Sequence, residues 1–135
     1  MITSSVEYTG GLRTEAIHIQ SGTKIITDAP KDNHGKGEAF SPTDLVATSL
    51  ASCMLSIMGI LANREGMTSI EGTKAEVVKV MVSDPRRISE VHVRVTFPKN
   101  GFSGKEQKMY ENAALTCPVA KSLHPDINQQ IEFIW

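Results

Sequence analysis

The sequence predicts a protein of the α+β class with largely antiparallel strands, and we expect its 135 residues to form one domain spanning residues 1–135. Strand-like runs alternate apolar and polar residues near the N-terminus and again between residues 76 and 97. These strands come in groups that are separated by helical segments, instead of alternating with helices one for one. The hydrophobic content of 40% and the charged content of 21% are ordinary for one globular core.

The first thirty residues are predicted to form three short antiparallel strands. Val6 and Tyr8 alternate with polar neighbours, Gly10 and Gly11 mark a turn, and Ser21-Gly22 is typical of a two-residue hairpin. Residues 28–39 are rich in Pro, Gly, Asn and Lys and lack any apolar period, so we expect a loop, and a mobile rim over a binding pocket.

The first helix should begin after Ser41, which is a typical N-cap residue, with Pro42 at the first helical position and Asp44 positioned to cap it. It should end near residue 65, because Gly66 can take the left-handed conformation that stops a helix. Residues 45–61 are apolar on nearly all sides but are interrupted by Ser, Thr and Gly, which favours a buried helix over a membrane span. A second subunit could supply part of its cover.

The second half is predicted to contain two strands, a helix and a last strand. Residues 76–82 and 88–97 flank the turn sequence Ser-Asp-Pro-Arg, a helix starts near Ser103 and runs towards Cys117, and residues 127–135 alternate again. The resulting order is β-β-β-α-β-β-α-β.

The overall charge excludes some partner classes. Lys and Arg total 14 against 15 Asp and Glu, so neither nucleic acid nor an anionic membrane is expected as a partner. The first residues lack the basic and apolar regions of a secretory signal, which favours a cytoplasmic protein. Because that compartment keeps thiols reduced, the two cysteines are expected to be free thiols or a redox couple.

Each cysteine has features beyond those of a buried structural thiol, which is the commoner role. Cys53 lies in a run of small residues, with the hydroxyls of Ser49 and Ser56 on the same helical face. Cys117 precedes Pro118, which should break the helix and leave Cys117 as the N-cap of a new turn, where amides and the helix dipole favour a thiolate. The two thiols could meet if their helices pack together.

Two segments resemble a known family. The run GEAFSPTDLVATSLASCM resembles the first-cysteine helix of the OsmC/Ohr (organic hydroperoxide resistance) proteins, in which the reactive cysteine follows a proline by eleven residues, as Cys53 follows Pro42. The run TCPVAKSLHPDI resembles their second-cysteine segment.

The resemblance implies a fold, an assembly and a chemistry. It implies an intertwined homodimer with sheets around two central helices and active sites at the subunit interface. Cys53 would attack an organic hydroperoxide and become a sulfenic acid, Cys117 would condense with it to a disulfide, and a cellular dithiol would reduce that disulfide. The resemblance implies no metal or organic cofactor.

The sequence departs from this family at the residues that support the thiolate. Relatives carry a Glu after the proline that pairs with an Arg holding the thiolate, and here that position is Thr43. Asp44 could supply the missing carboxylate, but it precedes Cys53 by nine residues and so lies on the opposite side of the helix, which favours a capping role. Arg13 is the candidate catalytic arginine, although a bulge at the preceding glycines would be needed to turn it to the right face, and Lys31 and Lys36 are alternative cations.

Two functions therefore stay open. The first is a cysteine-based peroxidase that uses Cys53, Cys117 and Arg13. The second is a binding protein without peroxidase activity on the same dimeric fold, holding an apolar or thiol-containing small molecule. The four histidines show no metal-ligand spacing, so no zinc site is expected.

Overall fold

The computed structural model describes all of residues 1–135, which form two compact units, residues 1–46 and residues 47–135. The prediction of a single domain stays a prediction. The first unit is a three-stranded antiparallel sheet in the order β1-β2-β3, as predicted, made of β1 (Ser4–Gly10), β2 (Arg13–His18) and β3 (Lys24–Asp28).

The turn between β1 and β2 contains the bulge that the sequence left open. The pairing register shifts between Tyr8 and Gly10, and Gly10, Gly11 and Leu12 have φ angles of 91°, 61° and 63°. Glycine adopts such angles without steric cost, which explains the pair of glycines here. The shift places Arg13 opposite Asp28, the last residue of β3.

The prediction of a two-residue hairpin at Ser21-Gly22 is wrong, because β2 ends at His18 and β3 begins only at Lys24. The Ser21 hydroxyl contacts His18 Nδ1 at 2.7 Å and Thr23 Oγ1 at 3.0 Å. These side-chain hydrogen bonds stabilise a wider turn, which the sequence rule for tight hairpins does not describe.

The first unit buries no hydrophobic side chain. Its three buried residues are Thr27, Asp28 and Ser41, all of them polar. Large apolar side chains of its sheet stand exposed instead, namely Val6, Tyr8, Ile25 and Ile26. This unit consequently has no apolar core of its own.

Helix α1 (Pro42–Glu65) starts and stops where the sequence predicts. The Ser41 amide donates to Asp44 Oδ2 at 3.0 Å, and the Asp44 amide donates to Ser41 Oγ at 3.1 Å, so the two residues cap the helix reciprocally. Gly66 ends it with a φ angle of 62°. By length and composition alone α1 could cross a membrane, a test that the core helices of soluble proteins also pass.

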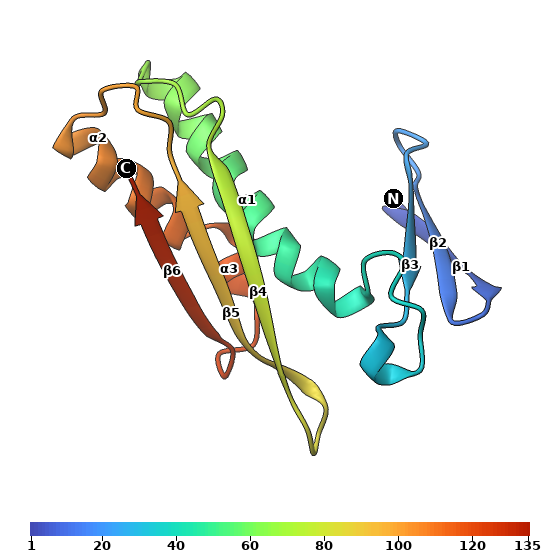
Figure 1. Ribbon diagram of the computed structural model, residues 1–135. Helices are drawn as coiled ribbons and strands as arrows, with labels where there is room; N and C mark the ends of the chain where they lie inside the picture. Colours follow the sequence, from blue (N-terminus) through green and yellow to red (C-terminus); the bar gives the residue numbers. More distant parts are fainter. The chain divides into compact units, whose positions relative to one another are not determined.

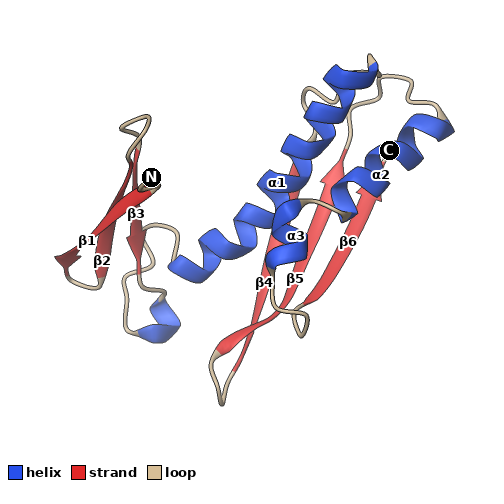
Figure 2. Cartoon of the chain, turned by 180° about the vertical axis from the view of Figure 1, so that it is seen from behind, coloured by secondary structure: helices blue, strands red, loops and turns tan.

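The second unit places its helices on one face of a mixed sheet, as both views show (Figure 1, Figure 2). The sheet order is β4-β5-β6, with strands β4 (Lys74–Val82), β5 (Arg87–Thr96) and β6 (Asn128–Ile134). The first pair is antiparallel, whereas β6 runs parallel to β5 because α2 (Gly104–Leu115) and α3 (Pro118–Ser122) form a crossover between them. The predicted α+β class with largely antiparallel pairing is confirmed.

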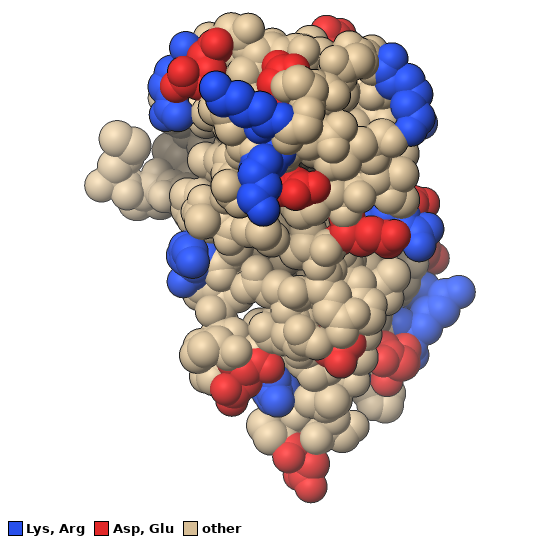
Figure 3. All heavy atoms as spheres, turned by 90° about the vertical axis from the view of Figure 1, so that its left-hand side faces the viewer, with Lys and Arg blue, Asp and Glu red and all other residues tan.

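The core of the second unit joins one face of α1 to the inner side of β5. The residues of α1 that are buried are Ala47, Leu50, Ala51, Met54, Met58, Leu61 and Ala62, and those of β5 are Ile88, Val91, Val93 and Val95. Beside them lies an aromatic cluster in which Trp135 stacks on Phe97, with ring centroids 3.6 Å apart. The outer surface of the molecule carries charges of both signs side by side on the face drawn in Figure 3.

Glu106 fastens α2 to the segment between α1 and β4. Its carboxylate accepts hydrogen bonds from the Thr68 amide at 2.7 Å, the Thr68 hydroxyl at 2.9 Å and the Ser103 amide at 3.2 Å. These donors favour the ionised form and lower the pKa of Glu106, the Thr68 amide having the largest effect. A depressed native pKa means that this carboxylate stabilises the fold fully above the ordinary pKa of glutamate, and that the stabilisation is lost as pH falls through the native value.

We therefore expect Glu106→Gln to lower the urea midpoint at pH 7. The difference from wild type should shrink as the pH falls below the ordinary pKa of glutamate, about 4.3, and through the lower native value, because wild-type Glu106 then takes up a proton. The measurement is urea denaturation followed by the fluorescence of Trp135, the single tryptophan. Glu65→Gln, which changes an exposed carboxylate at the end of α1, is the control. A midpoint difference that stays constant across this pH range would contradict the assignment.

Candidate active site

Cys53 lies in the middle of α1 at the border between its buried and exposed faces. Its neighbour Met54 is completely buried, its other neighbour Ser52 is exposed, and Cys53 itself is half-buried against the core. Successive helical residues differ in direction by about 100°, so a buried Met54 leaves Cys53 at the rim. The Cys53 thiol can therefore meet both the core and an approaching small molecule.

Cys117 has the N-cap position that the sequence predicts. Helix α2 ends at Leu115, and α3 begins at Pro118, whose missing amide would break a longer helix. Cys117 has the extended φ and ψ angles of −64° and 151°, and its sulfur accepts a hydrogen bond from the Ala120 amide at 3.4 Å. The side chain has no solvent exposure.

The structure brings the two cysteines together. The Cys53 thiol is near enough to the Cys117 thiol to raise its pKa, and both cysteines are free. Both belong to the second unit, where Cys117 is part of the same apolar core as the buried face of α1 and Cys53 packs against that core. The two residues are 64 positions apart in the sequence, which could allow this proximity but not establish it.

The two thiols have different surroundings. Burial raises the pKa of Cys117, and the thiol of Cys53 raises it further, while the Ala120 amide opposes the shift because it stabilises the thiolate. Burial is the largest of these effects, so Cys117 keeps its proton at neutral pH. Of the pair, Cys53 is the thiol that a reagent in solution can reach.

Arg13 belongs to the first unit, where two carboxylates surround it. Its guanidinium pairs with Asp28 at 3.4 Å and also contacts Glu38. The pKa of Arg13 is raised, mainly by Glu38, and the pKa of Asp28 is lowered, chiefly by the Glu38 amide and then by Arg13. Sequence reasoning missed both acidic residues, since it placed Asp28 at the start of a loop whereas Asp28 closes β3 and is buried.

The remaining candidates have simpler surroundings. Asp44 caps α1 as expected, and Thr43 contacts the Ser41 hydroxyl at 3.2 Å. Lys31 begins a short 3-10 helix, η1 (Lys31–Asn33), and Lys36 follows it in the loop. No three side chains of His, Cys, Asp or Glu gather in a way that could hold a metal ion.

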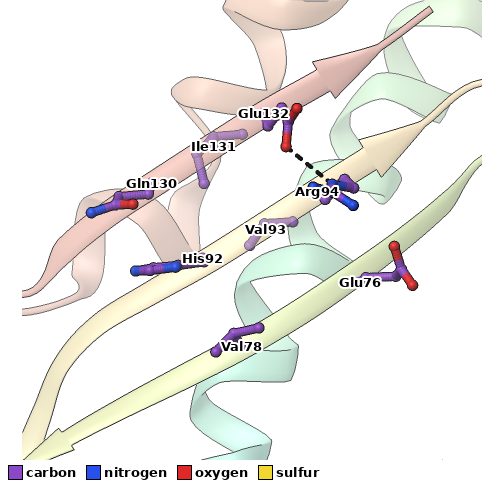
Figure 4. Close-up of a pocket in the computed structure, with 8 residues that line it drawn as sticks. All are labelled: Glu76, Val78, His92, Val93, Arg94, Gln130, Ile131 and Glu132. Atoms are coloured by element: carbon purple, nitrogen blue, oxygen red, sulfur yellow. Dashed lines mark hydrogen bonds and ion pairs between the residues drawn. The ribbon is translucent and has the colours of Figure 1, made fainter.

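A hollow of about 560 Å³ lies on the sheet of the second unit and is lined by residues of β4, β5 and β6 (Figure 4). Its polar lining includes an ion pair between Arg94 and Glu132 at 3.0 Å. The full lining is Glu76, Val78, His92, Val93, Arg94, Gln130, Ile131 and Glu132. It contains no thiol, so the chemistry of the cysteine pair does not take place there.

Comparison with known proteins identifies the family. The family model described as OsmC-like protein matches residues 35–132, which include both cysteines. The chain belongs to the OsmC family. None of the curated proteins compared with the chain matches it.

Solved structures agree with this assignment. A Psychrobacter arcticus 273-4 protein, provisionally described as an osmotic stress induced and detoxification response protein, shares 62% identity over 98% of this chain and 96% of its own, with a TM-score of 0.93. An organic hydroperoxide resistance protein OsmC from Legionella pneumophila shares 19% identity, with a TM-score of 0.73 and coverage of 100% and 98%. One from Elizabethkingia anophelis shares 19% identity, with a TM-score of 0.71 and coverage of 99% and 96%. The resemblance to OsmC/Ohr proteins inferred from the two cysteine segments is confirmed, and the more distant pair shows the shared fold.

In this OsmC family member, Cys53 should react with iodoacetamide faster than Cys117 at neutral pH. The expectation follows from the half-buried position of Cys53 and from the burial and raised pKa of Cys117. Timed alkylation followed by peptide mass spectrometry measures both rates in one sample, and labelling in denaturant provides the control in which the two rates should converge. Faster labelling of Cys117 in the folded protein would contradict the assigned order.

Proposed function

We propose that this protein is a thiol-dependent peroxidase that reduces organic hydroperoxides. The observation that carries the proposal is the proximity, in one unit, of a half-buried thiol, Cys53, and a buried thiol, Cys117. The hydroperoxide resistance proteins from Legionella pneumophila and Elizabethkingia anophelis, which share the fold, support it.

The proposed reaction has three steps. The Cys53 thiolate attacks one oxygen of the hydroperoxide, so that the O–O bond breaks, an S–O bond forms and the alkoxide leaves as an alcohol after taking a proton. The Cys117 thiol then attacks the sulfenic sulfur, forming the S–S bond and releasing water. A cytoplasmic dithiol reduces the disulfide by exchange and becomes oxidised itself.

The positions of the two cysteines suit these separate tasks. A peroxide in solution must reach the first thiol, and half-buried Cys53 is the more accessible member of the pair. The second thiol needs only to meet Cys53, and Cys117 is protonated and protected until a sulfenic acid forms beside it. In this proposal Arg13 stabilises the Cys53 thiolate, with Lys31 and Lys36 as alternative cations.

A binding protein without peroxidase activity is the second candidate. The ion pairs of Arg13 favour this candidate, because its single positive charge already faces the carboxylates of Asp28 and Glu38. An arginine engaged in this way has less charge to offer a thiolate. The cysteine pair would then sit beside a site for an apolar or thiol-containing small molecule.

We further propose that the protein is a homodimer. The first unit has no apolar core, and Val6, Tyr8, Ile25 and Ile26 stand exposed on its sheet. Helix α1 likewise exposes 39% of Val46 and 60% of Ile60 on the side away from the core. A second copy covering these surfaces would remove the exposed apolar area from water.

Stoichiometric organic hydroperoxide should link Cys53 to Cys117 within one chain of the wild-type protein. Cys53→Ser should abolish peroxide consumption, because no other reachable thiol is present. Cys117→Ser should consume about one equivalent and then stop as a sulfenic acid or a higher oxide, since the first step does not use the second thiol. Peroxide assays with mass spectrometry measure each outcome, and thiols unmodified in the folded protein would contradict the peroxidase and favour the binding protein.

Ile60→Lys should convert the dimer to monomer, because it would place a charge on the surface that the second copy is proposed to cover. The helical content should stay unchanged, because Ile60 lies outside the core of its own unit. Sedimentation velocity over a dilution series measures the assembly, and circular dichroism measures the fold. The matched control is Val78→Lys, which places the same charge on an exposed apolar residue of β4, 57% exposed in the structure. A wild-type monomer at all concentrations would refute the dimer.

A further inference from the structure

The loop between β3 and α1 follows a path fixed by its own backbone. The Asp28 amide donates to the Phe40 carbonyl at 3.0 Å, which closes the loop at its base, and the Gly37 amide donates to the Ala29 carbonyl at 3.2 Å. Gly35 packs so closely on Ala29 that an added β-carbon would lie 1.7 Å from the Ala29 carbonyl oxygen. The loop is therefore folded although it has no apolar period.

The carboxylate of Asp28 is the centre of this loop. It has no solvent exposure, and its Oδ2 accepts a hydrogen bond from the Glu38 amide at 2.9 Å and pairs with Arg13 at 3.4 Å. Its other oxygen is buried without a hydrogen-bond partner. A buried carboxylate depends on such partners to offset its lost hydration, so Asp28 holds both the loop backbone and the arginine.

Glu38 closes a ring of three residues. Its amide binds Asp28, and its carboxylate binds Arg13, which in turn binds Asp28. The Glu38 side chain is 62% exposed, in contrast to Asp28. One side of the ring is thus buried and the other is open to water and ions.

We propose that Arg13, Asp28 and Glu38 form a latch that holds the loop of residues 29–40 closed and sets the direction of the Arg13 side chain. Asp28 is its permanent anchor, and the contact between Glu38 and Arg13 is its releasable arm. This latch explains how a loop predicted to be a mobile rim can also be ordered. The loop is ordered while Glu38 contacts Arg13, and it opens when that contact breaks.

The two parts of the latch respond differently to salt. Exposed ion pairs are weakened by ions, and the screening length falls from about 10 Å at 0.1 M to about 3 Å at 1 M. Buried pairs are screened much less. Added salt should therefore release Glu38 while Asp28 stays bound, which opens the loop without unfolding the sheet.

Hydrogen exchange of the full-length protein tests the latch. Glu38→Gln removes the charge of the arm but keeps the amide that binds Asp28. We expect amides of residues 29–40 to exchange about two- to fivefold faster in this variant at 0.1 M NaCl, the range for one exposed ion pair. In the wild type, raising NaCl to 1 M should increase exchange towards the level of the variant, whereas the variant should respond little.

The matched control is Glu15→Gln, which removes another exposed ion pair of the same sheet, with Lys24 at 3.1 Å. It should leave exchange of residues 29–40 unchanged. Equal loop exchange in wild type and Glu38→Gln, or an equal effect of Glu15→Gln, would overturn the latch. Asp28→Asn should accelerate loop exchange more than Glu38→Gln does. If Asp28→Asn prevents folding, the comparison of wild type with Glu38→Gln and the salt series still test the latch.

Discussion

The packing of one face of α1 against β5 is the contact on which the cysteine site depends. Leu50, Met54, Met58 and Leu61 recur at helical spacing and fit against Val91, Val93 and Val95. This contact fixes the rotation of α1 about its own axis. Cys53, one position before the buried Met54, is held at the rim as a consequence, and a rotation that moved it further in or out would expose part of the core.

The second cysteine depends on a different constraint, the proline that follows it. Pro118 ends one helix and starts another, so Cys117 takes the extended backbone of an N-cap and turns its sulfur towards the Ala120 amide. A cysteine inside a continuous helix would have no such free amide beside it. The local sequence therefore sets the geometry of Cys117, while its partner is supplied by the tertiary fold.

The parts of the fold that local chemistry determines could be predicted from the sequence. The residues that begin and end α1 act on backbone groups only a few positions away, so both ends of this helix were predictable, as was the N-cap at Cys117. They are Ser41, Pro42, Asp44 and Gly66. The parallel pairing of β6 was not, because a strand pattern carries no direction.

The surroundings of Arg13 also lay beyond sequence reasoning. Its contacts with Asp28 and Glu38 join positions 15 and 25 residues away, and they require the bulge before Arg13 and the exact register of β2 and β3. A composition rule that reads residues 28–39 as loop cannot show that its first residue is a buried anion. Long-range pairing of charges depends on tertiary geometry, which the local pattern does not encode.

Different interactions stabilise the inside of each unit, and this difference bears on function. The second unit has an apolar core that orders the cysteines, whereas the first unit buries only polar residues and relies on hydrogen bonds and ion pairs. Arg13 carries one positive charge between two carboxylates, so the group of three has a net charge of −1 when all are ionised. In the proposed peroxidase, a thiolate brought to this group would be a third anion, and Arg13 could stabilise it well only after Glu38 had moved away. The peroxidase and the binding protein therefore differ most in how readily that exposed carboxylate leaves its arginine.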